Sequence, residues 1–299
     1  MAVLVTGGAG YIGSHMVLEL LDRGETVVVL DNLSTGVDWV VPEGVKLFVG
    51  ESGNQSLVAA IIRAHDIRAI IHFAASIVVP DSVSDPLGYY LNNTVNSRAL
   101  IEAAVKAGVQ HMIFSSTAAV YGTPERMPIN EDDRLNPESP YGMSKLMTEV
   151  MLRHASEAHG LGHVILRYFN VAGADPGQRT GQSTPRATHL IKVAAEAATG
   201  RRQGMSVFGT DYPTPDGTCL RDYIHVSDLA RAHSAALDHL RSGGANGTFN
   251  CGYGHGFSVF EVIDMVKKVS GVDFPVAIEG RRPGDPAGLV ADNGRIRSV

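Results

Sequence analysis

The amino-acid sequence predicts an α/β fold built on a doubly wound parallel sheet, and two observations carry this prediction. The first is a series of apolar runs rich in β-branched residues, which are continuous rather than alternating, as in strands covered on both faces. These runs occupy residues 2–6, 26–30, 45–49, 69–75, 111–116 and 163–170. The second is helical periodicity in the segments between them, at 12–23, 55–65, 87–107 and 141–158. Because strands that alternate with helices form a parallel sheet with right-handed crossovers, we expect a Rossmann-like domain over residues 1–170.

The second half of the chain predicts a smaller, mixed α/β domain with long loops. Loops rich in glycine, proline and polar residues span 173–186 and 204–219. Helices are expected at 187–199, 226–240 and 257–271, and strands at 221–226 and 247–252. We therefore assign residues 171–299 to a second domain, with parts of 221–250 returning to the first.

Composition and charge exclude several classes of function. The chain has 299 residues, of which 44% are hydrophobic and 19% charged, as in soluble globular proteins. Its formal net charge is −6 without a long block of like charge, which argues against a broad nucleic-acid surface. We find neither a signal peptide nor an apolar run of about 20 residues, so no membrane partner is expected. The histidines and the two cysteines, Cys219 and Cys251, show no metal-ligand spacing, and unpaired cysteines fit a cytoplasmic protein.

A glycine-rich turn follows the first strand directly. In GGAGYIG, Gly7, Gly10 and Gly13 are spaced by three residues, and Gly8, Gly10 and Gly13 also satisfy GxGxxG. Such glycines allow a tight turn, the approach of the backbone to a pyrophosphate, and close packing of the helix on the strand. The pyrophosphate then lies at the helix N-terminus, where free N–H groups and the helix dipole favour an anion.

The next strand ends in Asp31, 21 residues after Gly10 (31 − 10). A carboxylate in this place accepts hydrogen bonds from the adenosine ribose and repels a 2′-phosphate. The two features together predict a dinucleotide site that favours NAD over NADP. The competing interpretation is a plain glycine turn followed by a solvent-exposed aspartate.

Tyr141 and Lys145 lie four residues apart at the start of the helix predicted over 141–158, which places both side chains on one face. An ammonium group near a phenol lowers the pKa of the phenol from about 10 towards neutrality, and a positively charged nicotinamide ring would add to this effect. A tyrosine tuned in this way is a base for a sugar hydroxyl. Without the dinucleotide site upstream, a helix start with a surface lysine would be the better interpretation.

A further polar cluster, Ser115, Ser116 and Thr117, ends the strand predicted at 111–116. Ligands of open α/β sheets bind at the carboxyl ends of the strands. Thr117 can therefore hydrogen-bond to a reacting hydroxyl and orient it, although an ordinary Ser/Thr turn would have the same sequence.

Together and in this order, these motifs resemble the extended short-chain dehydrogenase/reductase family, and in particular its UDP-glucose (UDP-galactose) 4-epimerase branch. The resemblance covers essentially the whole chain and is carried by LVTGGAGYIGSH, VVLDNLS, IIHFAA, FSSTAAVYG, SPYGMSKLMTE, LRYFNVAGA, RDYIHVSDLA and RRPGDP. It implies an isomerase that interconverts UDP-glucose and UDP-galactose with tightly bound NAD. Hydride would leave C4, the 4-keto sugar would turn over while its UDP is held, and hydride would return to the other face.

The resemblance also implies a set of site residues. Tyr141 would be the base, Lys145 its activator and a ribose ligand, and Thr117 the third catalytic residue. The cofactor-binding residues would be Gly7, Gly10, Tyr11, Ile12, Gly13, Asp31, Asn32, Glu51, Phe73, Ala74, Ala75, Asn92, Ser115, Tyr141, Lys145 and Phe169. The substrate-binding residues would be Asn170, Leu190, Val207, Phe208, Arg221, Tyr223, Arg282 and Asp285. Arg221 and Arg282 make sense as diphosphate ligands because a guanidinium group matches phosphate oxygens.

Assembly is implied by the same resemblance. The helices predicted at 87–107 and 141–158 form a two-fold interface in this family, so we expect a homodimer. Burial of both helices under the sheet is the alternative explanation of their apolar faces.

Four features depart from the pattern of the family. Glu51–Ser52 replaces an acidic–apolar pair, which implies different adenine contacts, and Ile77 replaces a common lysine. Leu289 stands near the sugar 2-substituent, where the family has an aromatic or a small residue, so the acceptance of N-acetylated sugars stays open. We also expect a further C-terminal segment, because the family continues past ADNGRIRSV.

Three alternative functions remain. A sugar-nucleotide 4,6-dehydratase needs an acid at the strand end, where this chain has Ala118 and Ala119. A 4-epimerase of UDP-N-acetylglucosamine, UDP-glucuronate or UDP-xylose is poorly separated by the sequence. A non-catalytic NAD-binding protein is disfavoured by the intact pair of Tyr141 and Lys145.

Overall fold

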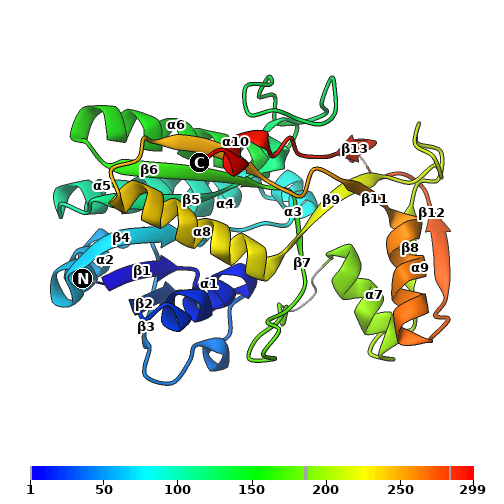
Figure 1. Ribbon diagram of the computed structural model, residues 1–299, viewed down its shortest axis with the longest axis horizontal. Helices are drawn as coiled ribbons and strands as arrows, with labels where there is room; N and C mark the ends of the chain where they lie inside the picture. Colours follow the sequence, from blue (N-terminus) through cyan, green and yellow to red (C-terminus); the bar gives the residue numbers. More distant parts are fainter. Residues whose placement is uncertain (1, 185–187, 283) are drawn as a thin grey trace.

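The computed structural model describes residues 2–184, 188–282 and 284–299 (Figure 1). Its larger part is one sheet of seven parallel strands. Across the sheet the order is β10 (Gly247–Cys251), β6 (Gly162–Tyr168), β5 (His111–Thr117), β4 (Ile67–His72), β1 (Ala2–Thr6), β2 (Thr26–Asp31) and β3 (Lys46–Val49). The order reverses at β1, which confirms the predicted doubly wound parallel sheet.

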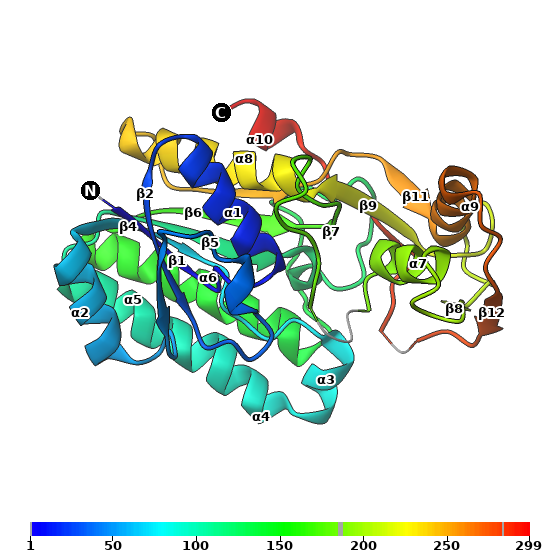
Figure 2. The same ribbon diagram turned by 90° about the horizontal axis from the view of Figure 1, so that it is seen from below.

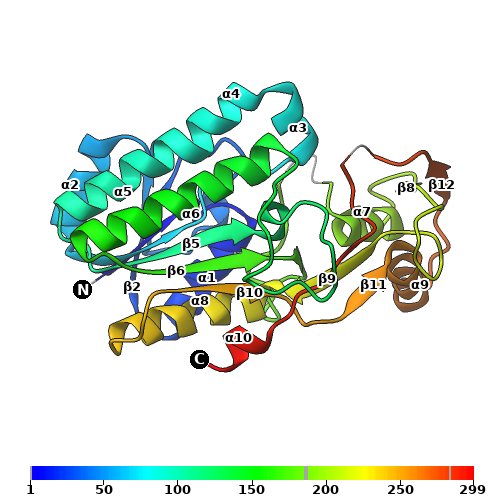
Figure 3. The same cartoon turned by 90° about the horizontal axis from the view of Figure 1, so that it is seen from above.

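Helices cover both faces of this sheet (Figures 2 and 3). On one face lie α1 (Tyr11–Asp22) and α8 (Val226–Arg241), and on the other lie α2 (Gln55–His65), α5 (Asn96–Lys106) and α6 (Pro140–His159). An apolar core lies on each face of the sheet, and successive residues of one strand point alternately into the two cores. Ile113 of β5 belongs to the core with α1 and α8, whereas Met112 and Phe114 belong to the core with α2, α5 and α6. Continuous apolar strands are the sequence signature of this double coverage.

The helix predicted over 87–107 is a composite. The chain after β4 forms α3 (Val79–Ser84) and α4 (Pro86–Tyr89), a π-helical turn over Tyr90–Val95, and then α5. The wider hydrogen-bond pattern of a π-helix leaves no mark on apolar periodicity, so the sequence predicted one helix. Short 3-10 turns also occur at Asp38–Val40 and Ala118–Val120.

A smaller lobe lies beyond the carboxyl ends of the sheet strands (Figure 1). Its central strand β9 (Leu220–His225) pairs with β7 (Asn170–Ala172), β11 (Gly256–Ser258) and β13 (Gly288–Leu289). A second pair joins β8 (Met205–Phe208) and β12 (Val276–Glu279), next to α7 (Leu190–Ala198) and α9 (Val259–Ser270). A short helix, α10 (Gly294–Arg297), lies near β10.

Several element boundaries differ from the sequence prediction. The strand expected to reach residue 75 ends at His72, and the one expected to reach residue 170 ends at Tyr168. The loop predicted at 204–219 contains β8, and the helix predicted from residue 187, which lies outside the described residues, begins at Leu190. Strands of two to four residues in the smaller lobe are too short to show a period of two.

Candidate active site

The glycine turn between β1 and α1 needs its glycines for different reasons. Gly7 has a left-handed backbone with φ +71°, and a Cβ there would lie 2.6 Å from the amide nitrogen of Ala74. A Cβ at Gly13 would lie 2.1 Å from the carbonyl oxygen of Gly7, because α1 packs directly on the turn. A Cβ at Gly10 would meet only that same oxygen, at 3.3 Å. This side of the turn is therefore open to the approach of a ligand.

The N-terminus of α1 has the character of an anion site. Gly10 is the N-cap and offers no side-chain acceptor, and the first turn contains no acidic residue. The first amide N–H groups are therefore available to a phosphate, which the helix dipole favours. The phenol of Tyr11 donates a hydrogen bond of 2.7 Å to the carbonyl of Gly173, and Ile12 packs on the core below α1. The free amide groups at this N-terminus, rather than these two side chains, are the feature suited to a phosphate.

Asp31 ends β2 and its carboxylate lies beside the glycine turn. Its Oδ2 accepts a hydrogen bond of 2.9 Å from the amide of Ala9, and its Oδ1 accepts one of 2.8 Å from the amide of Leu33. Asn32 follows, and its Nδ2 donates to Oε1 of Glu51 at 3.1 Å. Asp31, Asn32 and Glu51 thus form one polar rim at the ends of β2 and β3, where the sequence placed the adenosine.

The segment after β4, Phe73–Ala75, runs beside the glycine turn and is held by the π-helical turn. Nδ2 of Asn92 donates to the Ser76 hydroxyl at 2.9 Å. Asn93, which the sequence did not single out, accepts from the Ser76 amide at 2.8 Å and donates to the Ser144 hydroxyl of α6 at 3.1 Å. The π-helical turn therefore links the segment after β4 to α6, the helix of Tyr141.

The start of α6 is pressed against the end of β5. The hydroxyl of Ser139, the N-cap, accepts from the Gly142 amide at 3.2 Å. A Cβ at Gly142 would lie 2.6 Å from the carbonyl oxygen of Ala119, so the first turn touches the segment after Thr117. This close approach places Tyr141 beside Thr117, whose hydroxyl lowers the pKa of the phenol.

Lys145 is buried one turn further along α6. Its Nζ donates a hydrogen bond of 2.9 Å to the carbonyl oxygen of Ser115. The Thr117 hydroxyl accepts from the Ala119 amide at 3.1 Å, which leaves its own proton free to donate. The structure therefore brings Tyr141, Lys145, Thr117 and Ser115 together at the carboxyl end of β5.

The protonation of this cluster corrects the sequence prediction in one respect. Burial raises the pKa of Tyr141 to about 12, against the opposite effect of the Thr117 hydroxyl. Burial also lowers the pKa of Lys145 to about 7. The expected lowering of the phenol pKa by the lysine is therefore wrong for the protein chain alone. Burial disfavours the charged form of both groups, and the hydrogen bond of the lysine goes to the backbone carbonyl of Ser115 rather than to the phenol.

Four of the predicted substrate-binding residues form two close pairs in the smaller lobe. Nη2 of Arg221 donates to Oδ1 of Asp285 at 2.9 Å. The guanidinium group of Arg282 lies 3.6 Å from the ring centroid of Phe208. Arg281, next in the chain to Arg282, instead donates to Oδ1 of Asp211 at 2.7 Å.

The other predicted substrate residues, and Phe169, contribute differently. Asn170 of β7 is the register partner of Tyr223 in β9, and burial raises the pKa of Tyr223 to about 12. Leu190 and Val207 belong to the core of the smaller lobe, so Val207 offers a ligand only its backbone. Phe169 is buried in a separate core cluster beside the active-site strands.

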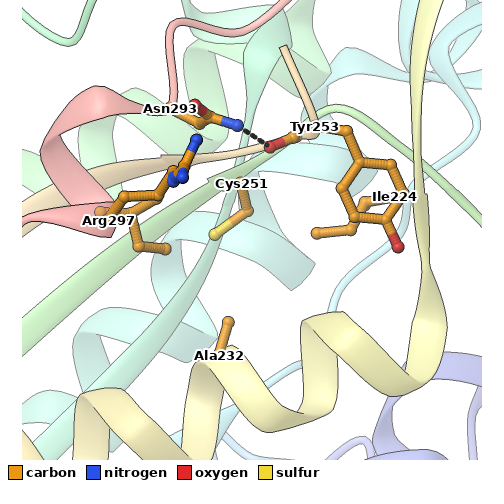
Figure 4. Close-up of a pocket in the computed structure, with 8 residues that line it drawn as sticks. Ile224, Ala232, Cys251, Tyr253, Asn293 and Arg297 are labelled. Carbon is orange, nitrogen blue, oxygen red and sulfur yellow. Dashed lines mark hydrogen bonds between the residues drawn. The ribbon is translucent and has the colours of Figure 1, made fainter. Parts of the chain in front are cut away.

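A pocket under α10 lies apart from these residues (Figure 4). It is lined by Ile224, Ala232, Cys251, Gly252, Tyr253, Asn293, Ile296 and Arg297. Burial raises the pKa of the Cys251 thiol, which makes it a poor nucleophile. Among residues 2–184, 188–282 and 284–299, no group of His, Cys, Asp or Glu is arranged to hold a metal ion. In the same part of the chain, none of the helices has the length and apolar character needed to span a membrane.

Comparisons with known proteins point in one direction. A family model described as "NAD dependent epimerase/dehydratase family" matches residues 3–252. A UDP-glucose 4-epimerase of Azospirillum brasilense is 59% identical over 99% of this chain and 85% of its own length. The crystal structure of a UDP-glucose 4-epimerase from Brucella ovis in complex with NAD has a TM-score of 0.96 at 44% identity, covering 99% of this chain and 91% of that one. A UDP-Glc/GlcNAc 4-epimerase from Campylobacter jejuni has a TM-score of 0.86 at 50% identity, covering 99% and 92%.

Proposed function

This chain belongs to the NAD dependent epimerase/dehydratase family, and we propose that it interconverts UDP-glucose and UDP-galactose by C4 epimerisation through a 4-keto intermediate, with NAD tightly bound. One observation carries the proposal. Tyr141, Lys145 and Thr117 meet at the carboxyl end of β5, in a sheet whose glycine turn and Asp31 fit a dinucleotide. Oxidation of a secondary alcohol requires a base that accepts the hydroxyl proton and a nicotinamide that accepts the hydride, and this arrangement provides a site for both.

The residues of the chain divide the proton chemistry among them. Thr117, whose oxygen already accepts from the Ala119 amide, has its O–H proton available to donate to the sugar 4-hydroxyl and orient it. Tyr141 removes the proton of that hydroxyl and returns it after the sugar has turned. Bound NAD would supply both the hydride acceptor for C4 and a positive charge beside Tyr141. Because burial alone holds the phenol protonated, that charge and the ammonium form of Lys145 are what make the base effective.

The smaller lobe holds the UDP part while the hexose turns. Arg282 and Arg221 present guanidinium groups for the diphosphate, with Asp285 fixing the position of Arg221. Phe208, Tyr223, Asn170 and Leu190 complete the wall, together with the backbone at Val207. Because the UDP part is bound away from the reacting carbon, the 4-keto sugar can turn and present either face to the same position of the nicotinamide.

The other UDP-sugars remain the second candidate for the substrate. Leu289 of β13 is half-buried and packs with the cluster that contains Phe169 and Ala118. The relative from Campylobacter jejuni, named a UDP-Glc/GlcNAc 4-epimerase, gives UDP-N-acetylglucosamine priority among the alternatives to be assayed. A dehydratase is disfavoured because Ala118 and Ala119 place no acid beside the hexose.

An anaerobic incubation with UDP-galactose, without added NAD, tests the proposal. We expect UDP-glucose to accumulate to equilibrium, with a transient absorbance of reduced nicotinamide, since the cofactor is restored in each cycle. Absence of conversion by intact, NAD-loaded protein would rule out the proposed function. Parallel incubations with UDP-N-acetylglucosamine and UDP-glucuronate decide the substrate range.

We also propose a homodimer, with a second copy of the chain on the face formed by α4, the π-helical turn and α6. Large apolar side chains gather on these elements. Leu87 is 78% exposed and Leu91 is 59% exposed, and Val95, Met147 and Val150 are exposed as well. Light scattering after size-exclusion chromatography should give a molar mass of twice the 31.8 kDa chain mass. In Leu91→Arg the measured mass should fall to that of a single chain, because the charge disrupts the apolar face. A cytoplasmic location stays a prediction from the unpaired cysteines.

A further inference from the structure

Glu149 lies two turns after Tyr141 on the same face of α6, and its carboxylate is buried. It is 0% exposed, and Arg167 of β6 opposite it is 2% exposed. Nε of Arg167 donates to Oε1 of Glu149 at 3.0 Å, and Nη2 donates to Oε2 at 2.7 Å. The Ser116 hydroxyl of β5 donates to Oε1 as well, at 2.5 Å.

These contacts fix α6 to two strands at a single level of the sheet. Ser116 and Arg167 are register partners across β5 and β6. Glu149 therefore contacts both members of one cross-strand pair. These contacts define the position of α6 along the strands and its rotation about its own axis. The neighbouring residues of β5 are the ones that the active site uses. The carbonyl oxygen of Ser115 accepts a hydrogen bond from Lys145, and Thr117 lies beside Tyr141.

Arg167 is itself held from its other side. Its Nη1 donates to the phenol oxygen of Tyr121 at 2.9 Å and to the carbonyl of Glu131 at 3.1 Å. The Tyr121 hydroxyl donates to Oδ1 of Asn250 in β10 at 2.7 Å. Arg153 of α6 also donates to Oε2 of Glu149, at 3.3 Å, and Arg295 and the buried Glu131 are the other charged groups around this cluster. The guanidinium group of Arg167 thus has no freedom to follow α6 if the helix shifts.

A buried ion pair is a costly way to attach a helix. Desolvation of both charges offsets most of their attraction, and an apolar pair of equal volume would stabilise the fold about as well. What the bidentate geometry adds is direction, since two parallel hydrogen bonds allow one relative position. Proton transfer is sensitive to that position, because a misplacement of about 1 Å reduces rates strongly.

We propose that Glu149 is a positioning residue for the proposed epimerisation: clamped by Ser116 and Arg167, it sets where α6 places Tyr141 and Lys145 against the end of β5. The inference rests on the proposed function for its kinetic consequence. Its structural consequence, the alignment of the Tyr141 phenol with Lys145, can be measured without any sugar.

The test compares NAD-loaded Glu149→Gln and Ser116→Ala with Glu157→Gln, the same chemical change at an exposed position of the same helix. We expect kcat for UDP-galactose to fall about 10- to 100-fold in Glu149→Gln and several-fold in Ser116→Ala. KM should stay within about twofold, and Glu157→Gln should match the wild type. If Glu149→Gln does not fold, Glu149→Met/Arg167→Met removes both charges together and should still show the loss of kcat.

A spectroscopic measurement separates positioning from simple stabilisation. The ultraviolet absorbance of the Tyr141 phenolate, taken as the difference from the matching Tyr141→Phe protein, gives the pH at which this phenol ionises. In NAD-loaded Glu149→Gln the midpoint should rise by about half a pH unit or more, because the phenol would no longer lie in register with the positive charges of the bound nicotinamide and of Lys145. An unchanged kcat and midpoint, with only a lower Tm, would overturn the inference. A wild type inactive on UDP-sugars would instead refute the proposed function, and the phenolate titration would still decide this one.

Discussion

The ammonium group of Lys145 and the carbonyl oxygen of Ser115 are joined by a hydrogen bond of 2.9 Å, so the lysine is attached to the strand end that carries Thr117. Its side chain is buried, and its charge is therefore held at a cost to the fold. In the proposed mechanism, this position holds the ammonium group one helical turn from the phenol of Tyr141.

Replacement of Tyr141 by phenylalanine should abolish turnover and leave the cofactor in place. The change removes only the hydroxyl, so kcat should fall by about 10²- to 10⁴-fold, the usual contribution of a general base. NAD released on denaturation, measured per protein chain, should equal that of the wild type. Tyr253→Phe, at a half-exposed tyrosine outside the site, is the control. Loss of NAD from the Tyr141 variant would mean that the tyrosine has a structural role instead.

Gly10→Ala should weaken the binding of NAD, whereas Gly13→Ala should lower the stability of the fold. A Cβ at Gly10 meets only one atom at 3.3 Å, so the NAD-free protein should keep its free energy of unfolding within about 1 kcal/mol. Its affinity for NAD should fall about tenfold or more, because the methyl group occupies the approach of the pyrophosphate. Gly13→Ala places a Cβ 2.1 Å from a backbone oxygen and should destabilise the fold itself. Urea unfolding and calorimetric titration with NAD distinguish the two, and equal losses of stability would contradict this assignment.

Arg282→Gln should raise KM for UDP-glucose about 10- to 100-fold with little change in kcat. A residue that holds the diphosphate binds the substrate and the transition state equally, which appears in KM alone. Arg281→Gln offers a matched control one residue away, since Arg281 is paired with Asp211 and should leave both constants unchanged. A larger effect at position 281 than at 282 would reverse the assignment of the two arginines.

The burial of Lys145 predicts a pH dependence of stability. Its pKa is lowered to about 7 in the folded protein, so between this value and the ordinary 10.5 the unfolded chain binds more protons than the folded one. Stability should therefore rise with pH across this window relative to Lys145→Met, by at most about 1.4 kcal/mol per pH unit. Urea unfolding of both NAD-free proteins from pH 6 to 10 measures the difference. A flat difference would show that the lysine keeps its ordinary pKa.

Most of the sheet could be predicted because its strands carry their own signal. The runs at 2–6 and 111–116 are continuously apolar, and the glycine turn stands between a strand and a helix. The central strand of the smaller lobe, β9, was predicted at 221–226, but the π-helical turn around Asn93 and the strands of two to four residues in that lobe escaped prediction, because neither a π turn nor so short a strand leaves a period. Such elements are defined by partners far away in the chain.

The candidate site could be predicted in its residues but not in its electrostatics. The spacing of Tyr141 and Lys145 places them on one face, yet the direction of the phenol pKa depends on burial by other elements. Glu149 continues the same spacing, and Arg167 interrupts an apolar strand, so each had a sequence signal. The contact between them depends on how α6 packs across β6, and the spacing of residues in the sequence does not predict that packing.

The place of β10 in the sheet has a consequence for how the protein is made. This edge strand, Gly247–Cys251, is contributed by the last fifth of the chain, yet it pairs with β6 and supplies Asn250 to the Tyr121 hydroxyl. While the ribosome is still adding these residues, β6 has an open edge, and that edge is a template for pairing with another nascent chain. Chaperone protection should therefore be needed until synthesis has passed residue 251, and fragments that stop before it should aggregate rather than bind NAD.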